Sequence, residues 1–189
     1  MSDTILYCTK MDSPVGPLAL VSSQKGLLRV LFLSSHRNRN FTTAVQKNFP
    51  NAEIIESETK FQEVMTQLRE YFEGKRRTFS VELDLRGTLF QLQVWHALQK
   101  VRYGETATYG EIARKIQKPN ASRAVGNACR ANPIPILIPC HRVIGKNGDL
   151  TGFAGGLETK RQLLHLESQF LSRSDPFQCV ASSNRTWGN

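Results

Sequence analysis

The sequence lacks the features that mark disulfide-rich mini-proteins, zinc knuckles and membrane spans. Its four cysteines, at positions 8, 129, 140 and 179, form no C-x-x-C pair and no dense, even pattern, so neither a disulfide framework nor a metal site is indicated. No stretch approaches the roughly 20 apolar residues of a membrane span, and the first residues show no basic segment followed by an apolar run. We expect a soluble intracellular protein with reduced thiols, nuclear in a eukaryote or cytoplasmic in a prokaryote, with no cofactor, metal or membrane.

Basic charge is present, and it is unevenly distributed. The net charge is +9, with residues 1–85 carrying 11 Lys or Arg against 10 Asp or Glu, and residues 86–189 carrying 14 against 6. A basic excess in one half suits contact with a polyanion, because each phosphate that is neutralised releases counterions. A solvated basic surface explains the same counts, so charge alone leaves both interpretations open.

The first 85 residues predict a small α/β domain with a structural role. Apolar or alternating runs predict strands, and helical spacing predicts helices; the strands are expected at 4–11, 17–23, 26–33 and 79–85, and the helices at 41–49 and 59–72. This half holds no motif with assignable chemistry, so we interpret its aromatic and Met side chains as core. The chain is long enough for two small domains, and we place the boundary near residue 86.

Beyond the boundary the pattern favours helices. Thr88 is placed to cap a first helix, and Thr108 with Glu111 forms a capping box for a second, shorter one. A polar turn separates the latter from a helix at 121–131. Two short helices around a tight turn are a helix-turn-helix candidate, although many all-α proteins contain such hairpins. The last residues, 171–189, are polar and rich in Ser, and predict a disordered tail.

The helix predicted at 121–131 carries mostly small side chains. Ala121, Gly126 and neighbouring alanines give it little bulk, while Arg123 and Arg130 supply charge. A flat helix face with one arginine suits the narrow minor groove better than base readout in the major groove, where longer polar side chains are useful. Small residues serve tight helix packing equally well. If the helix meets DNA, we expect binding with little sequence preference.

Cys140 lies in the run Pro139-Cys-His-Arg-Val143. A thiol becomes a good nucleophile as the thiolate, and a histidine oriented by a carboxylate can lower its pKa. His141 and a later acidic residue can supply such a network. A cysteine in an apolar run is more often buried and inert, but Pro139 before it and His-Arg after it make that less favourable. Cys140 is therefore a candidate nucleophile.

Four motifs of the C-terminal half resemble, in order and spacing, those of the O6-alkylguanine-DNA alkyltransferase family. They are Arg123-Ala-Val-Gly126, Asn132-Pro-Ile-Pro135, Pro139-Cys-His-Arg-Val143 and Gly155-Gly-Leu157. The match covers roughly residues 86–168, and the N-terminal half is similar more loosely, in its layout and in Asp12-Ser-Pro14. The resemblance implies an α/β, ribonuclease H-like N-terminal domain (1–85) with a small antiparallel sheet, and a mainly α, winged-helix-like domain (86–170) for DNA binding and alkyl transfer.

The resemblance also implies roles for individual residues. Cys140 would accept the alkyl group, His141 would act as its base through a water, and Glu167 would orient His141. Asn132 matches a hinge asparagine between the recognition helix and the active-site strand. Arg123 matches the arginine that enters the duplex and fills the space of the flipped nucleotide.

Four further positions correspond to residues around the substrate. Tyr109 matches a tyrosine beside the flipped guanosine, whose hydroxyl favours departure of the guanine by hydrogen bonding at N3. Lys160 corresponds to a lysine that assists the active-site network. Backbone groups near Cys140, Val143 and Ala154 would read the guanine edge, and the small side chain of Ala154 leaves room for alkyl groups larger than methyl.

The implied function is DNA repair by direct reversal. The protein would flip the nucleotide through the minor groove and transfer the methyl group of O6-methylguanine, and of O4-methylthymine, from double-stranded DNA to Cys140. The thioether formed has no good leaving group, so a monomer would act once; cooperative binding to DNA is left open. Three alternatives remain: a non-catalytic lesion-binding protein that recruits excision repair, a helix-turn-helix regulator, and a thiol hydrolase with many turnovers.

Overall fold

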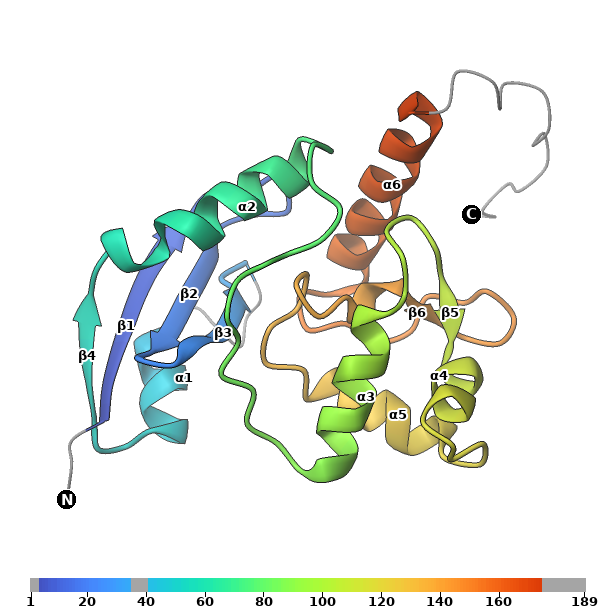
Figure 1. Cartoon of the computed structure of the whole chain (residues 1–189), viewed down its shortest axis with the longest axis horizontal. Helices are drawn as coiled ribbons and strands as arrows, with labels where there is room; N and C mark the ends of the chain where they lie inside the picture. The colour runs from blue at the N-terminus through green and yellow to red at the C-terminus, as the bar shows by residue number, and fades with distance from the viewer. Residues whose placement is uncertain (1–3, 35–40, 175–189) are drawn as a thin grey trace.

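The computed structural model describes residues 4–34 and 41–174 of the 189-residue chain. Figure 1 shows a sheet with helices, formed by the N-terminal half, beside a mainly helical C-terminal half. An extended segment runs from one half to the other. Among the described residues, no helix is long and apolar enough to cross a membrane.

The N-terminal half is built on a four-stranded sheet with strand order β3-β2-β1-β4. Its elements are β1 (Thr4–Met11), β2 (Leu18–Ser23), β3 (Gly26–Phe32), α1 (Phe41–Asn48), β4 (Ala52–Glu56), the 3-10 turn η2 (Thr59–Phe61) and α2 (Gln62–Phe72). Strand β1 pairs antiparallel with β2 but parallel with β4. The sheet is therefore mixed and not purely antiparallel as expected, because the crossover through α1 returns the chain in the direction of β1. Strand β4 was not predicted.

The prediction of a strand at 79–85 is wrong. Within the described ranges this segment has one isolated bridge, between Leu83 and Leu27, with the Leu27 amide bonded to Glu82 O and the Asp84 amide to Leu27 O. Its alternating apolar side chains pack against the main core. An extended linker that is buried on one side shows the same period of two as a strand, without a ladder of hydrogen bonds.

The C-terminal half contains the predicted pair of short helices. Its elements are α3 (Leu89–Gln99), β5 (Ala107–Thr108), α4 (Tyr109–Lys115), α5 (Ser122–Arg130), the 3-10 turn η3 (Cys140–Arg142), β6 (Val143–Ile144) and α6 (Leu157–Ser174). Thr88 and Thr108 both form complete capping boxes, with Gln91 and Glu111. Helix α6 continues to Ser174, so residues 171–174 of the expected tail are helical; the rest of that tail lies outside the described residues.

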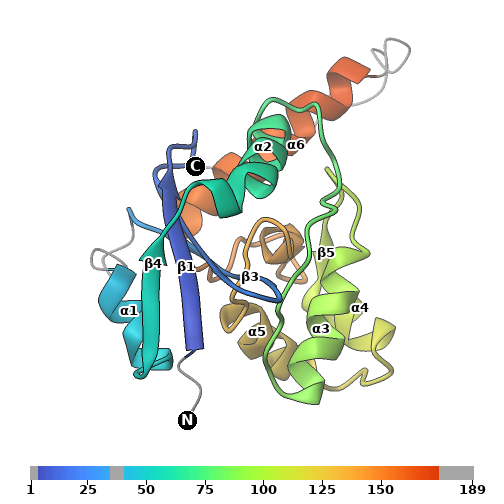
Figure 2. The same ribbon diagram turned by 60° about the vertical axis from the view of Figure 1, so that its left-hand side comes forward.

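The two faces of the sheet belong to different core clusters. On one face Leu18 and Leu20 join a cluster that includes α2 and continues through α3, α5 and the start of α6. On the other face Leu6 and Val21 pack with Val45 of α1 in a smaller cluster. Successive residues of a strand point to opposite faces, which explains this division. Figure 2 shows α1 and α2 on the two sides of the sheet, and the end of α2 reaches α6 through a hydrogen bond of 2.7 Å from Tyr71 to Glu167. The larger cluster thus joins the two halves.

Candidate active site

Cys140 opens the 3-10 turn η3 and is 5% exposed. The expected active-site strand is therefore a helical turn at this residue. The Asn132 amide, just beyond α5, donates from Nδ2 to Cys140 Sγ at 3.1 Å and to Ile138 O at 2.8 Å. Its Oδ1 accepts from the Ile134 amide at 3.0 Å. Asn132 thus ties the end of α5 to the thiol.

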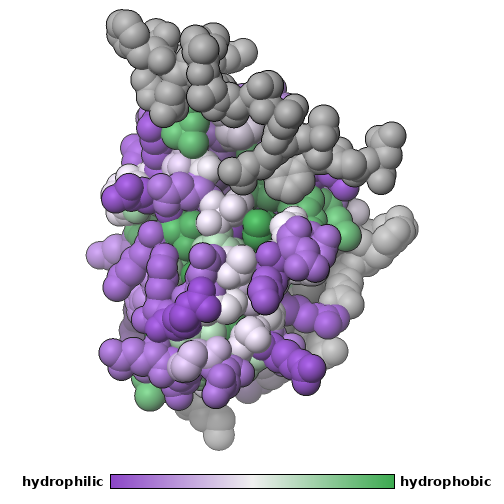
Figure 3. Space-filling model, turned by 90° about the vertical axis from the view of Figure 1, so that its right-hand side faces the viewer, coloured by the Kyte–Doolittle hydropathy of each residue, from purple (hydrophilic) through white to green (hydrophobic). Residues whose placement is uncertain are grey.

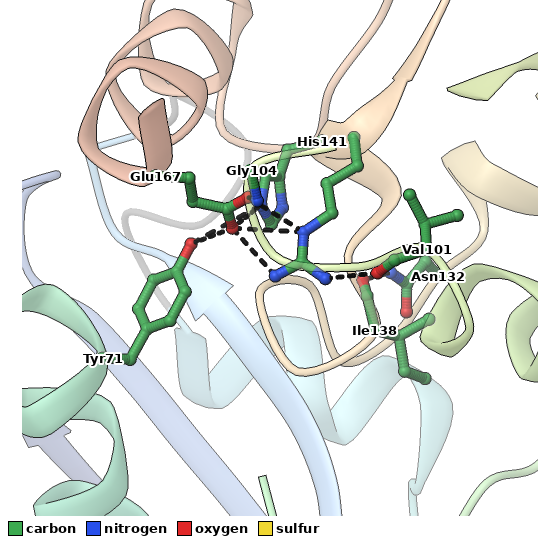
Figure 4. Close-up of polar contacts among 8 residues, drawn as sticks. Tyr71, Val101, Gly104, Asn132, Ile138, His141 and Glu167 are labelled. Carbon is green, nitrogen blue, oxygen red and sulfur yellow. Dashed lines mark hydrogen bonds and ion pairs between the residues drawn. The ribbon is translucent and has the colours of Figure 1, made fainter. Parts of the chain in front are cut away.

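His141 and Glu167 form a fully buried pair. His141 Nε2 lies 2.8 Å from Glu167 Oε1, and both side chains have no exposed surface. Glu167, on α6, also accepts from Arg142, with Nη2 at 2.9 Å from Oε1 and Nε at 3.0 Å from Oε2. The Gly104 amide reaches Oε2 at 2.9 Å. Figure 4 shows these donors converging on one carboxylate, which compensates for the cost of burying its charge.

The charge of Glu167 fixes which nitrogen of His141 is free to act. Burial raises the pKa of Glu167, but hydrogen bonds and charge from His141 and Arg142 outweigh it and lower the pKa to about 2. A carboxylate only accepts, so His141 Nε2 carries the proton and Nδ1 keeps a lone pair. Nδ1 is buried and has no hydrogen-bond partner among the described residues. Burial also lowers the pKa of His141, which keeps the ring neutral and able to take a proton.

Cys140 is a protonated thiol in the resting site. Burial raises its pKa to about 11, against the hydrogen bond from Asn132 and the positive charge of Lys160. At neutral pH a thiol with such a pKa does not react unless a base removes its proton. The neighbouring His141 ring is a base of this kind. The arrangement therefore suits a nucleophile that depends on an adjacent base for its activation.

Lys160 joins the site to the loop that follows β6. It is on α6, fully buried, and its Nζ donates to Val143 O at 2.6 Å and to Thr151 O at 2.8 Å. Tyr109 Oη shares a hydrogen bond of 2.9 Å with Thr151 Oγ1. A Cβ atom on Gly126 would lie 3.7 Å from the Tyr109 ring. Thr151 and Tyr109 therefore connect Lys160 of α6 with Gly126 of α5.

Three other residues that the sequence singled out lie nearer the surface. Arg123, on α5, and Ala154, in the loop before α6, are exposed, while Ala121 at the start of α5 is half-buried. Figure 3 views the molecule from the side of α4 and β5, where hydrophilic residues flank a paler strip with some hydrophobic patches. These positions suit contact with a large partner better than contact with the buried thiol.

Sequence reasoning missed three contributors to the site. Arg142 could have been found, because it follows His141 directly and a buried carboxylate needs cationic partners. Gly104 and Tyr71, whose Oη donates to Glu167 at 2.7 Å, carry no local signal, since they come from distant segments. Within 4–34 and 41–174, no group of three or more His, Cys, Asp or Glu is placed to hold a metal ion.

Two family models match the chain in sequence order. The model described as 6-O-methylguanine DNA methyltransferase, ribonuclease-like domain, matches residues 6–85. The model described as 6-O-methylguanine DNA methyltransferase, DNA binding domain, matches residues 89–169. Together they span most of the chain.

Curated relatives and solved structures are similar over nearly their whole length. A methylated-DNA--protein-cysteine methyltransferase of Methanosarcina mazei is 47% identical over 88% of this chain and 99% of its own. The inducible enzyme of that name from Bacillus subtilis is 45% identical over 82% of this chain and 87% of its own. A crystal structure of Mycobacterium tuberculosis OGT in complex with DNA is 42% identical, with a TM-score of 0.75, covering 88% of this chain and 94% of that one.

Proposed function

The chain belongs to the family of 6-O-methylguanine DNA methyltransferases, and from this premise we propose that Cys140 is its alkyl acceptor. The protein repairs DNA by direct reversal, transferring methyl groups from DNA to one of its own cysteines. The assignment of Cys140 rests on the groups around its thiol. It is a buried thiol bonded to Asn132 and followed by a histidine whose other nitrogen faces an anionic carboxylate.

The relay activates the thiol by moving its proton to His141. A water accepts the proton of Cys140 Sγ and passes one to His141 Nδ1, and the imidazolium that forms is stabilised by Glu167. A buried imidazolium is stable only beside an anion, and the Glu167 carboxylate, held by its hydrogen bonds, supplies that negative charge. Asn132 and Lys160 favour the thiolate, the first by a hydrogen bond to sulfur and the second by its charge.

The transfer is a displacement at carbon. The thiolate attacks the methyl carbon in line, a carbon–sulfur bond forms, and the bond between that carbon and O6 breaks. Guanine leaves with the electron pair as a stabilised anion and then takes up a proton, which the Tyr109 hydroxyl assists by donating at N3. No group in the site can cleave the thioether, so the protein acts once.

The target methyl group is inaccessible in a duplex, because O6 is paired inside the base stack. The nucleotide must rotate out, at a cost of a few kcal/mol that is smaller for a poorly paired lesion. We assign this step to α5, with Ala121 and Gly126 facing the minor groove and Arg123 filling the vacated space. Val143 and Ala154 then read the guanine edge.

The domains divide these tasks. We assign DNA binding and alkyl transfer to residues 86–170, with the protein acting as a monomer and with little sequence preference. We propose that it recognises O6-alkylguanine, and O4-methylthymine in addition. Since its partner is DNA, we place it in the nucleus of a eukaryote or the cytoplasm of a prokaryote.

The decisive experiment maps the transferred methyl group. The protein is incubated with a duplex containing one isotopically labelled O6-methylguanine, and its peptides are analysed by mass spectrometry. We expect one label per protein molecule, on the peptide containing Cys140, and no turnover. Binding without modification would instead support a lesion sensor, and many turnovers would support a hydrolase.

Two cysteine variants provide the control. Cys140→Ala should bind the lesion duplex without repairing it. Cys129→Ala removes another buried thiol, whose pKa burial raises to about 12, and should still transfer the label to Cys140. Loss of transfer in both variants would point to a general packing defect.

The loop before α6 predicts the range of substrates. Ala154 is small and exposed, so it leaves space for adducts larger than methyl. We expect benzyl groups to be removed as well, in single-turnover assays on matched duplexes. Replacement by a bulky residue, Ala154→Trp, should slow benzyl transfer more than methyl transfer, and complete refusal of benzyl by the unaltered protein would contradict this expectation.

A further inference from the structure

Tyr71 brings the N-terminal half into contact with the relay. It lies near the end of α2, has no exposed surface, and donates from Oη to Glu167 Oε1 at 2.7 Å. The same oxygen is 3.5 Å from His141 Nε2. In Figure 4 the phenol points from α2 across to the carboxylate on α6. Among the described residues, the other donors to Glu167 come from the C-terminal half: His141, Arg142 and Gly104.

The Tyr71 ring packs against three other aromatic rings. Its centroid lies 5.3 Å from that of Phe72, 5.5 Å from that of Phe79 and 5.7 Å from that of Tyr103. Packed aromatic rings at these spacings restrict the side chain to one orientation. Burial and the charge of Glu167 raise the pKa of Tyr71 well above its usual value. The hydroxyl therefore stays protonated and always donates.

We propose that Tyr71 is a positioning residue for methyl transfer, whose hydroxyl holds the Glu167 carboxylate so that Oε1 faces His141. The N-terminal domain, expected from the sequence to be structural, thereby completes the active site. This inference rests on the proposed roles of Cys140, His141 and Glu167.

The physical basis is competition for one oxygen. Glu167 Oε1 accepts from Tyr71, from His141 and from Arg142. A bond donated by Tyr71 fixes the carboxylate plane and also makes Oε1 a weaker acceptor for His141. Without the hydroxyl, the carboxylate loses one of the hydrogen bonds that orient it. Oε1 then becomes a stronger acceptor and binds the imidazolium of His141 more strongly.

Two measurable effects follow from Tyr71→Phe. The single-turnover rate of methyl transfer should fall about tenfold, the usual effect of one hydrogen bond to a charged group. The midpoint of the acid side of the pH–rate profile should rise by about half a pH unit, because His141 is then protonated at higher pH. Besides Tyr71 itself, whose hydroxyl is 3.5 Å from Nε2, the charged groups that face His141 are Glu167, Arg142 and Lys160, and the variant leaves these three in place.

Tyr103→Phe is the matched control. Tyr103 belongs to the same aromatic cluster, and its buried hydroxyl has no hydrogen-bond partner among the described residues. We expect its rate and pH midpoint to stay within about twofold and about 0.1 unit of the unaltered protein, since an unbonded hydroxyl contributes little. Both variants should bind a lesion duplex within about twofold of the unaltered affinity, because neither hydroxyl is at the surface.

A reference variant separates failure of this inference from failure of the proposed relay. If Glu167→Gln transfers methyl at the unaltered rate, the role of Glu167 itself is wrong. If Glu167→Gln is slow while Tyr71→Phe matches Tyr103→Phe in rate and pH midpoint, only the role of Tyr71 is overturned. Adding Tyr71→Phe to Glu167→Gln should slow transfer less than it does alone, because the two residues act through one contact. Equal slowing in both backgrounds would also overturn the proposal.

The midpoint of the pH–rate profile distinguishes loss of positioning in Tyr71→Phe from partial unfolding of the variant. Transfer rates are compared on protein that near-UV circular dichroism shows to be folded. A smaller folded fraction lowers the amplitude of the reaction and leaves the midpoint of the rate profile where it was. A slow Tyr71→Phe with an unmoved midpoint would therefore assign Tyr71 to packing alone and overturn the positioning role.

Discussion

The two halves of the molecule bury very different side chains. Among the described residues, the buried polar side chains of the N-terminal half are uncharged, and those of the C-terminal half include one carboxylate, one guanidinium and one ammonium group. The buried polar residues of the first half are Thr9, Ser22 and Gln67; those of the second are Asn132, His141, Arg142, Thr159, Lys160 and Glu167.

The difference indicates that the C-terminal half gives up some folding stability in order to bury the charged groups of its active site. An apolar core stabilises in proportion to the area it removes from water, and the face of the sheet around Leu6 and Val21 has that character. Buried charges cost several kcal/mol each before their partners offset it. The relay residues are tolerated because Glu167 and Lys160 are surrounded by partners, and the N-terminal half supplies one of these, the Tyr71 hydroxyl.

The largest effect on stability should come from Glu167→Gln. Removing the anion leaves Arg142 buried without a counter-charge, which costs about 3–5 kcal/mol in other buried pairs. Urea unfolding of the variant should show a loss of that order, and methyl transfer should slow in the folded fraction. A loss below about 1 kcal/mol would mean that the buried charges are not partners in solution.

The same residue predicts a loss of stability in acid. The pKa of Glu167 is lowered by folding to about 2, so its contribution is present above the unfolded pKa and is lost as pH falls from about 4.3 towards 2. Unfolding free energies of the unaltered protein should decline over this range. The Glu167→Gln variant should lose less over the same interval, and an identical decline would assign acid sensitivity to other carboxylates.

A core truncation on the far face of the sheet should affect stability alone. Leu6 is fully buried in the smaller cluster with α1, so Leu6→Ala should cost about 2–5 kcal/mol in unfolding free energy. The folded fraction should transfer methyl at the unaltered rate, because Leu6 does not contact the relay. Slower chemistry per folded molecule would show that the two clusters are coupled.

A smaller loss should follow from Lys160→Met. The variant removes the donor to Val143 O and Thr151 O, and a buried carbonyl left without a partner costs about 1–3 kcal/mol. We expect a net loss of about 2 kcal/mol, with slower transfer because the positive charge near Cys140 is gone. Lys100→Met, at an exposed position, is the control and should change stability by less than about 0.5 kcal/mol.

The smallest effect on stability should come from Arg123→Ala. Arg123 is exposed on α5, so unfolding free energy should change by less than about 0.5 kcal/mol. Binding to undamaged duplex should weaken only slightly, while nucleotide flipping, followed with a fluorescent base analogue, and repair should fall about tenfold or more. Arg130→Ala removes the same charge from the same helix; equal effects of both variants would remove the special role of Arg123.

Local signals predicted the elements whose physical cause is local. The sequence indicated a cap at Thr88 and a capping box at Thr108, and both form; Thr88 also completes a capping box with Gln91. The prediction of a strand at 79–85 was wrong because strands and linkers packed on one side show the same alternation of buried and exposed residues. Strand β4 was missed because its five residues are partly buried or exposed, so it shows no apolar run, and its pairing with β1 depends on a crossover.

The sequence alone determined the family, the candidate thiol and the pair of short helices, because motifs and caps are carried by residues close together in the chain. It also indicated which half of the protein is basic. Only the tertiary structure decided that the thiol starts a 3-10 turn, that its resting pKa is high, and that Glu167 gathers its donors from both halves. Tyr71 and Glu167 are 96 residues apart. Such a contact leaves no local pattern, since it depends on the fold bringing the end of α2 to α6.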